Sequence, residues 1–190
     1  MIRNYVSPFQ YRGIILKIVA FSTSNSKNSI NKKLAAYVAG LFDGADIEVL
    51  DLNDYEIPLF SVDREAEIGQ AEQAKDFLAK IASADFLVVS AAEHNGNFPA
   101  AWKNLFDWCT RIEKQVFQNT PMILLSTSPG GLGGATVMEI ALNSFPRFGT
   151  EIKAHLSIPN FNDHFDSEAN ELTDASYKDE LMQAIGALAS

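Results

Sequence analysis

Five short apolar segments alternate along this chain with longer segments whose apolar residues recur at helical spacing. The apolar segments are 14–21, 46–52, 85–91, 121–126 and 152–158, and the helical patterns occupy 29–42, 64–81, 99–114, 135–148 and 174–188. Strands that alternate with helices pair in parallel through right-handed crossovers, which place helices on both faces of one sheet. The sequence therefore predicts an α/β protein with a five-stranded parallel sheet.

Five strands of this kind fit the order 2-1-3-4-5, the three-layer sandwich that is called flavodoxin-like. Periodicity alone does not fix the order of the strands. In that order, successive strands are added first to one side of the first strand and then to the other, so a switch point lies between the first and third strands. Ligands bind outside the carboxyl ends of the strands at such a point. Residues 1–13 show no periodicity, so we interpret them as an amino-terminal arm and 14–190 as one domain.

The net charge bears on the class of partner, and the cysteine content bears on the redox compartment. A formal net charge of −9 argues against nucleic acid or an anionic membrane as the main partner. Cys109 is the only cysteine, so no internal disulfide can form, and we expect a reducing, cytoplasmic setting. We expect neither a signal peptide nor a membrane span, since no apolar run approaches the ~20 residues that a span needs.

The loop after the first strand, residues 22–29, consists of serine, threonine and asparagine residues and one lysine. Ser29 stands where it can cap the following helix. Hydroxyls, backbone N–H groups and the positive end of a helix together favour an anion, and a phosphate is the natural ligand. The alternative is a polar turn without a ligand. Neither Gly-x-Gly-x-x-Gly nor a P-loop lysine follows the strand, which argues against a dinucleotide site or a nucleotide triphosphatase.

The loop after the third strand contains Glu93, His94 and Asn95, whose polar groups suit the edge of a flat heterocycle. The alternative for His94 is a surface histidine without a role. The three histidines of the chain lack ligand spacing, so we expect no metal site. In the next helix, apolar residues from Trp102 to Cys109 recur at helical spacing and indicate either core or a dimer face.

A glycine-rich loop, residues 126–134, follows the fourth strand and would let the backbone approach a ligand closely. The alternative is a simple connection between strand and helix. Ser126 and Ser128 lack the Gly-x-Ser-x-Gly pattern of a hydrolase nucleophile. We therefore predict no catalytic side chain.

Taken together, the three loops resemble the NADPH-dependent FMN reductase family, a flavodoxin-like group that includes quinone, chromate and azo-dye reductases. The family signature Gly-Ser-x-Arg-x-x-Ser-x-Asn aligns with residues 23–31, and Ser-x-Gly-x-x-Gly-Gly aligns with 128–134. The most specific signature, Pro-x-Tyr-Asn-x-x-x-Pro-x-x-Leu-Lys-Asn-x-x-Asp-Trp, aligns with 92–108. The departures from the pattern include Thr23 in place of glycine, Ser26 in place of arginine, Ala92 in place of proline and His94 in place of tyrosine.

The resemblance, which covers residue 16 to the carboxyl end, implies FMN as the cofactor and assigns a role to each loop. The residues that it places near the FMN phosphate are Ser24, Ser26, Ser29 and Asn31. Those that it places along the isoalloxazine are Ala92, Glu93, His94 and Asn95 on one side and Ser128, Gly130 and Gly131 on the other. An arginine–phosphate contact is worth roughly 1.5–3 kcal/mol, so serine at position 26 weakens FMN binding without preventing it.

The resemblance also implies an activity and an assembly. NADPH or NADH would pass a hydride to bound FMN, and a quinone, azo compound, metal oxyanion or free flavin would then be reduced. A homodimer or a dimer of dimers is implied, with the helix after Pro99 at or near the interface. Two alternatives stay open: a flavodoxin-like electron carrier that a partner protein reduces, and a family member that has lost flavin.

Overall fold

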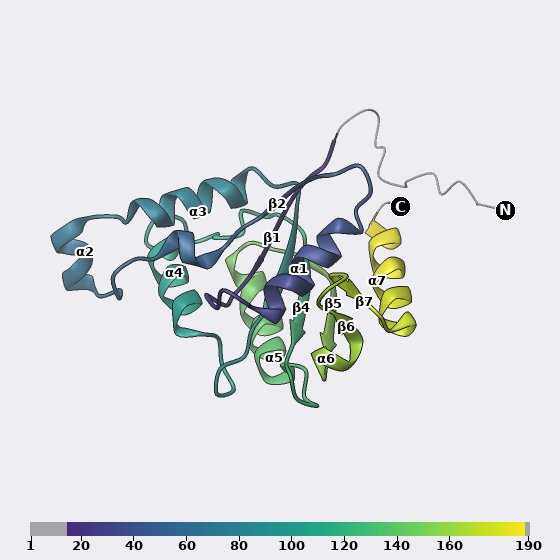
Figure 1. The fold of residues 1–190 in the computed structure, drawn as a ribbon. Coiled ribbons are helices and arrows are strands. Elements are labelled where there is room, and N and C mark those ends of the chain that lie inside the picture. Colours follow the sequence, from purple (N-terminus) through teal and green to yellow (C-terminus); the bar gives the residue numbers. More distant parts are fainter. Residues whose placement is uncertain (1–14, 189–190) are drawn as a thin grey trace.

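A computed structural model describes residues 15–188 and shows one parallel sheet between two layers of helices (Figure 1). The order β2-β1-β3-β4-β5 confirms the predicted fold. The strands are β1 (Lys17–Ser22), β2 (Asp46–Val49), β3 (Phe86–Ala91), β4 (Met122–Thr127) and β5 (Ile152–Ile158). The predicted amino-terminal arm, residues 1–13, lies outside the described residues.

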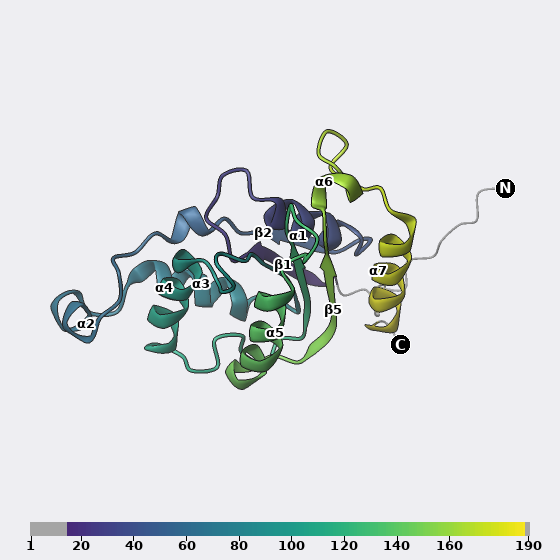
Figure 2. The same ribbon diagram turned by 90° about the horizontal axis from the view of Figure 1, so that it is seen from below.

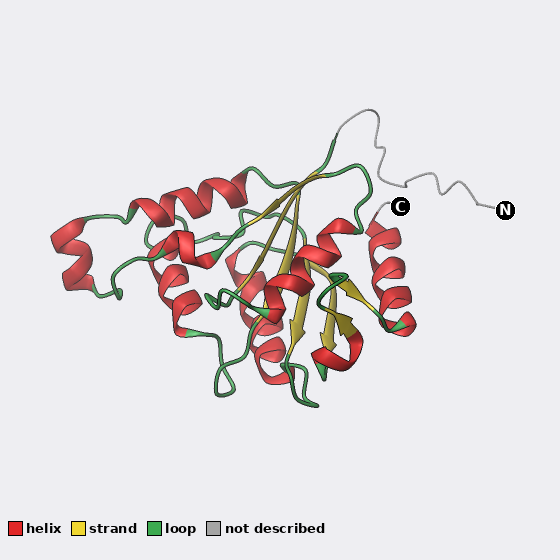
Figure 3. Cartoon of the chain, in the orientation of Figure 1, coloured by secondary structure: helices red, strands yellow, loops and turns green. Residues whose placement is uncertain are grey.

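The helices cover both faces of the sheet, as Figures 2 and 3 show. The helices on one face are α3 (Glu72–Ala82), α4 (Ala100–Thr110) and α5 (Ala135–Ser144), and those on the other are α1 (Ile30–Gly40) and α7 (Ala175–Leu188). Shorter helices are η1 (Leu52–Tyr55), α2 (Val62–Ile68), η2 (Phe145–Phe148) and α6 (Phe161–His164).

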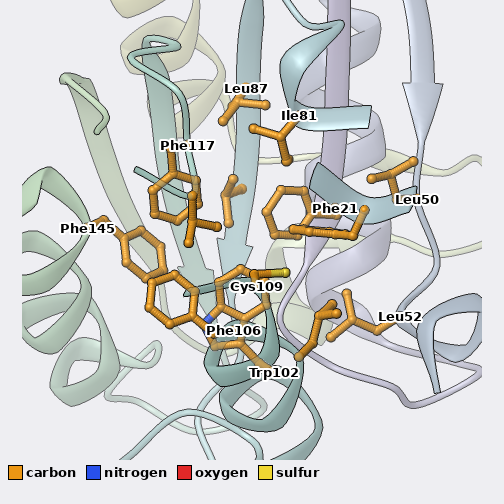
Figure 4. Close-up of a cluster of buried hydrophobic side chains, with 14 of the residues drawn as sticks. Phe21, Leu50, Leu52, Ile81, Leu87, Trp102, Phe106, Cys109, Phe117 and Phe145 are labelled. Atoms are coloured by element: carbon orange, nitrogen blue, oxygen red, sulfur yellow. The ribbon is translucent and has the colours of Figure 1, made fainter. Parts of the chain in front are cut away.

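Each face of the sheet has its own hydrophobic core, because successive side chains of a strand point to opposite faces. Val19 and Phe21 of β1 face α3 and α4, whereas Ile18 and Ala20 face α1. The larger core contains the aromatic residues of α4, and Trp102 there lies 5.5 Å from Phe21 between ring centroids (Figure 4). The apolar pattern of α4 is therefore core of this chain.

Two details of the fold differ from the sequence prediction. The pattern over 64–81 predicts one helix, but the structure contains α2 and α3, because Gly69 adopts a φ of 73° and ends α2. A small antiparallel pair, β6 (Phe165–Asp166) and β7 (Glu171–Leu172), was not predicted, because two-residue strands show no periodicity. Pro146 ends the preceding helix as expected, since α5 stops before η2.

Candidate functional site

The loops after β1, β3 and β4 meet at the carboxyl edge of the sheet and line a cavity of about 250 Å³. The strand register brings the loops together, since Ser22 pairs with Ser90 and Ala91 pairs with Ser126. Predicted site residues that line the cavity are Ser24, Ser26, Ser29, Asn31, Ala92, Glu93, His94 and Ser128. Asn95, Gly130 and Gly131 do not line this cavity.

Sequence reasoning did not assign four further residues that line the cavity, which are Asn28, Ile30, Thr127 and Pro129. Each of them stands next to a residue of the family signatures. Asn28, Thr127 and Pro129 lie inside the predicted loops and Ile30 begins α1 directly after the first loop, which is the signal by which they could have been found. Consecutive residues of each loop therefore line the cavity.

Serine hydroxyls hold the first loop in shape. Ser24 N donates to Ser22 Oγ at 3.3 Å, and Ser26 N donates to Ser24 Oγ at 3.1 Å. Ser29 Oγ accepts from Lys32 N at 3.1 Å, which confirms Ser29 as the cap of α1. Because these hydroxyls bond to the loop's own backbone, they shape the site before any ligand binds.

The tip of the first loop leaves backbone donors free. The N–H groups of Asn25, Lys27 and Asn28 donate to no acceptor within residues 15–188. They lie next to the amino end of α1, where the helix dipole adds a partial positive charge. Lys27 is exposed, whereas Lys32 binds Asp51 at 2.5 Å. An anion at this loop therefore meets backbone donors and little side-chain charge.

The Asn31 carboxamide is buried and joins α1 to the neighbouring strands. Its Nδ2 donates to Thr127 O at 3.1 Å. Its Oδ1 accepts from Thr127 N at 3.1 Å and from Ser90 Oγ at 2.7 Å. Asn31 thereby fixes the ends of β3 and β4 beneath the cavity, and its direct contact with a phosphate stays a prediction.

The loop after β3 is anchored at its start and closed by a tight turn. Ala92 N donates to Thr23 Oγ1 at 2.8 Å, so the threonine at the family's glycine position ties the first loop to the second. His94 N donates to Asn97 O at 2.8 Å across a turn in which Asn95 and Gly96 have φ values of 53° and 74°. Asn-Gly suits such left-handed geometry. The turn leaves His94 and Asn95 exposed.

Glu93 links the second loop to α5, the helix that follows the third loop. Its Oε2 accepts from Val137 N at 3.0 Å, in the first turn of α5. Gly134, at the cap position of α5, provides no side-chain cap of its own. A carboxylate at this position satisfies a free N–H and interacts favourably with the helix dipole. Glu93 therefore caps α5 from the neighbouring loop and fixes the distance between the two loops.

The glycine loop needs glycine at two of its positions. Gly133 and Gly134 have φ values of 61° and 78°, and a Cβ on Gly133 would lie 2.8 Å from Pro159 N. Ser126 Oγ donates to Gly133 O at 2.8 Å and holds the loop against the sheet. Gly130 and Gly131 have open space around them. The close approach therefore occurs between this loop and β5, while positions 130 and 131 stay accessible.

These features fit a ligand that combines a phosphate with a flat ring. The free N–H groups of the first loop suit a phosphate. The second and third loops supply the polar and backbone edges of a planar group, and they are fixed to each other by Glu93. The chain therefore has a preformed polar cradle at the switch point of its sheet.

Metal and thiol chemistry find no support in residues 15–188. No group of three or more His, Cys, Asp and Glu side chains there is arranged to hold a metal ion. Burial raises the pKa of the Cys109 thiol to about 12, which keeps it protonated and unreactive at neutral pH. None of the helices in this part of the chain has the length and apolar character to cross a membrane.

Comparison with known sequences identifies a family and several individual relatives. Residues 16–163 match the family of NADPH-dependent FMN reductases. The uncharacterized MG342 homolog of Mycoplasma pneumoniae is 31% identical over 148 residues, which is 75% of this chain and 87% of that protein. A 2-hydroxy-1,4-benzoquinone reductase of a Burkholderia species is 35% identical over 127 residues, 63% of this chain and 64% of its own. The quinone reductase of Escherichia coli K12 is 30% identical over 121 residues, with the same coverage of 63% and 64%.

Solved structures share the fold over nearly the whole described chain. FerB from Paracoccus denitrificans, a flavoenzyme NAD(P)H:(acceptor) oxidoreductase, has a TM-score of 0.71 and 23% identity, with 92% of this chain and 96% of that chain covered. An FMN-dependent NADH-azoreductase from Bacillus anthracis, solved with FMN, has a TM-score of 0.59 and 16% identity, with 93% and 100% covered. Because the family match spans residues 16–163, this chain belongs to the NADPH-dependent FMN reductases, oxidoreductases with FMN as cofactor and NAD(P)H as co-substrate.

Proposed function

We propose that this protein is an FMN-dependent NAD(P)H oxidoreductase whose acceptor is a small quinone. The observation that carries the proposal is the convergence of the three signature loops on one cavity at the switch point of the sheet. Quinone is the acceptor class because two relatives at 30–35% identity are named as quinone reductases. The chain spans about two thirds of the length of those two relatives, 64% in each case.

Each loop has a distinct task in the proposed enzyme. The first loop holds the FMN phosphate with its free N–H groups and with the hydroxyls of Ser24, Ser26 and Ser29. The second loop edges the isoalloxazine with Ala92, Glu93, His94 and Asn95. The third loop borders the flavin with Ser128, Gly130 and Gly131. Asn31 supports all three loops from below through its bonds to Ser90 and Thr127.

The redox chemistry belongs to the cofactor and the positioning belongs to the chain. FMN held by the three loops would supply the redox chemistry, as hydride acceptor from NAD(P)H and electron donor to the acceptor. The loops orient the ring edge and leave one side open to the two substrates in turn. This division of labour requires no acidic or basic side chain at the reacting atoms, and we assign none. We further propose that the enzyme is a homodimer.

The proposal is tested by reduction and reoxidation of the flavin-loaded protein without oxygen. The protein is loaded with FMN and mixed with NADH or NADPH, and the flavin absorption is followed until 1,4-benzoquinone is added. We expect rapid bleaching by at least one nicotinamide and full recovery with the quinone. An azo dye, added in place of the quinone, measures acceptor preference. The two nicotinamides, compared at equal concentration, give the coenzyme preference.

Two outcomes would replace the proposal with a different function. Bound FMN that is bleached by dithionite but by neither nicotinamide would indicate an electron carrier, which the net charge of −9 would suit as a partner for basic proteins. A chain that binds no FMN at any concentration tested would be a family member that has lost its cofactor.

A further inference from the structure

A second cavity lies between η1 and the amino end of α4, two elements that stand side by side in Figure 1. Its volume is about 550 Å³, which is within the range of cavities that hold small ligands. We call it the η1 cavity, and we call the cavity of about 250 Å³ at the carboxyl edge of the sheet the edge cavity. The proposed function leaves the η1 cavity without a role.

The two cavities share their walls. Asn25 lines the η1 cavity, while its chain neighbours Ser24 and Ser26 line the edge cavity. Ala100 and Ala101, which line the η1 cavity, follow directly after the second loop, which lines the edge cavity. Because consecutive Cα atoms are about 3.8 Å apart, only the tip of the first loop separates the two spaces. One extended substrate can therefore reach from the edge cavity into the η1 cavity.

Tyr55 lines the η1 cavity with a hydroxyl that lacks a partner. The side chain is only 9% exposed, and its ring packs edge-on against Phe77 with centroids 5.2 Å apart. The hydroxyl forms no hydrogen bond with residues 15–188, yet no fully buried polar side-chain atom there is unpaired, so the hydroxyl is the end that reaches the cavity. Burial, followed by nearby carboxylates, raises the pKa of this phenol to about 12. A ligand therefore meets a fixed, protonated donor.

The amino end of α4 supplies backbone donors to the same cavity. Its N-cap is Pro99, which has no side chain that could accept a hydrogen bond. The N–H groups of Ala100 and Ala101 donate to no acceptor within residues 15–188, and Lys103 N is the first to bond, to Pro99 O at 3.1 Å. Unpaired N–H groups and the positive end of a helix dipole favour a phosphate. Asn25, whose backbone N–H is also free, lines the same space.

The wall opposite in character to these donors is apolar and is fixed before any ligand binds. Leu52, Ile57 and Leu59 supply its apolar surface. Asn104 holds the segment in place, since its Nδ2 donates to Ile57 O at 3.1 Å and its Oδ1 accepts from Phe60 N at 2.8 Å. An apolar wall with a few fixed polar groups suits a flat heterocycle. The η1 cavity therefore combines a phosphate site with a heterocycle site.

The charge of the cavity narrows the ligand further. Among the described residues that line it, Glu56 is the only one of the types Asp, Glu, Lys, Arg and His. Its exposed carboxylate forms no ion pair or hydrogen bond with residues 15–188. A carboxylate accepts hydrogen bonds from the hydroxyls of a ribose, whereas a phosphate on that ribose requires a cation such as arginine. The cavity therefore favours an unmodified ribose.

We propose that the η1 cavity holds the adenosine diphosphate part of the nicotinamide substrate and that Glu56 makes NADH the preferred coenzyme over NADPH. The pyrophosphate binds the N–H groups of Ala100 and Ala101, and the adenine lies against the apolar wall, where Tyr55 donates to it. Glu56 accepts from the ribose hydroxyls. The nicotinamide reaches the edge cavity past Asn25. This inference rests on the proposed function, because it names the coenzyme of that same enzyme.

Calorimetric titration of the FMN-loaded protein with ADP-ribose and with 2′-phospho-ADP-ribose tests the cavity without any redox step. We expect the wild type to bind ADP-ribose more tightly. Glu56→Arg should shift the ratio of the two dissociation constants at least roughly tenfold toward the phosphorylated ligand. The matched control is Asp54→Arg, which makes the same change of charge at an exposed residue of η1 that does not line the cavity. The control should change the ratio far less.

Tyr55→Phe tests the heterocycle site. The variant keeps the ring against Phe77 and removes only the hydroxyl, so the melting temperature should not change. Loss of one hydrogen bond should weaken the binding of both ligands roughly threefold to tenfold.

Three results would overturn the proposal. They are a wild type that binds no ADP-ribose or prefers the phosphorylated ligand, a Tyr55→Phe variant with unchanged affinities, and an Asp54→Arg control that shifts the ratio as far as Glu56→Arg does. Bleaching of the wild-type flavin by reduced nicotinamide mononucleotide, which has no adenosine, is recorded on the same samples. Failure of that bleaching and of bleaching by NADH would count against the proposed function, while the titrations would still decide on the cavity.

Discussion

The carboxyl edge of the sheet and the segment 57–70, an arm that includes α2, are built in opposite ways. At the edge, small polar side chains are buried, and no buried side-chain polar atom of the described residues lacks a hydrogen-bond partner. In the arm, no residue of α2 is buried, and large apolar side chains stand in solvent. The polar groups of the edge are paired within one chain, whereas the arm leaves large apolar side chains exposed in the described residues.

The difference shows what a site needs before its ligand arrives. A phosphate and a flat ring require donors at fixed positions, so Asn31, Ser90 and Thr127 are bonded to one another under the cavity. The exposed apolar side chains of the arm meet no such requirement, because they take no part in the core of the chain. Substitutions at the edge should therefore lower the stability of the fold, and substitutions of exposed residues in the arm should leave it nearly unchanged.

The largest effect on folding is expected for Asn31→Leu. The substitution leaves Thr127 N, Thr127 O and Ser90 Oγ without their partner, and such a loss costs about 3 kcal/mol of unfolding free energy. The matched change in the arm, Val62→Ala, should cost less than about 0.5 kcal/mol in the monomer. Urea unfolding of both variants, at a protein concentration low enough that only monomer is present, measures the contrast. Equal losses would remove the distinction between the two regions.

A smaller effect is expected for Glu93→Ala. Loss of the bond to Val137 N removes the external cap of α5 and should lower stability by about 1 kcal/mol. Because the same bond fixes the second loop against the third, FMN affinity should fall as well. Glu93→Gln keeps an acceptor and should recover most of both quantities, while Glu139→Ala, exposed on α5, should change neither. Stability loss without any change in FMN affinity would limit Glu93 to a helix cap.

We expect the Cys109 thiol to react very slowly with thiol reagents in the native protein. Burial raises the pKa of its thiol to about 12, so at pH 8 a thiol reagent should react with the native protein at least roughly a hundredfold more slowly than with the urea-unfolded protein. In Cys109→Ala, a cysteine introduced by Val62→Cys should react fast, because the side chain at position 62 is exposed. A fast reaction of native Cys109 would show that the core beside α4 opens readily.

Much of the fold could be predicted because its signals are local. The alternation of apolar strands with helical patterns indicates parallel pairing, and the structure confirms the order of all five strands. The break at Gly69 was not predicted, although glycine is common just after a helix; its φ of 73° ends α2 there. The pair β6–β7 was too short to show a period.

The candidate site could be predicted less completely, since its contacts join distant parts of the chain. The signatures located the three loops, and the cavity contains eight of the assigned residues. They could not show that the Asn31 carboxamide bonds to Ser90 and Thr127, which lie 59 and 96 positions away. The role of Glu93 as a cap of α5 was hidden for the same reason, because Val137 is 44 positions distant.

The most direct test of the site is titration of FMN and riboflavin against the wild type and Ser26→Arg by flavin fluorescence. Ser26 lines the cavity where the family places an arginine, and the two ligands differ only in the phosphate. If the first loop holds the phosphate, the arginine should tighten FMN by roughly 1–3 kcal/mol and leave riboflavin unchanged. Equal tightening of both ligands, or no change for FMN, would contradict the assignment of this loop to the FMN phosphate.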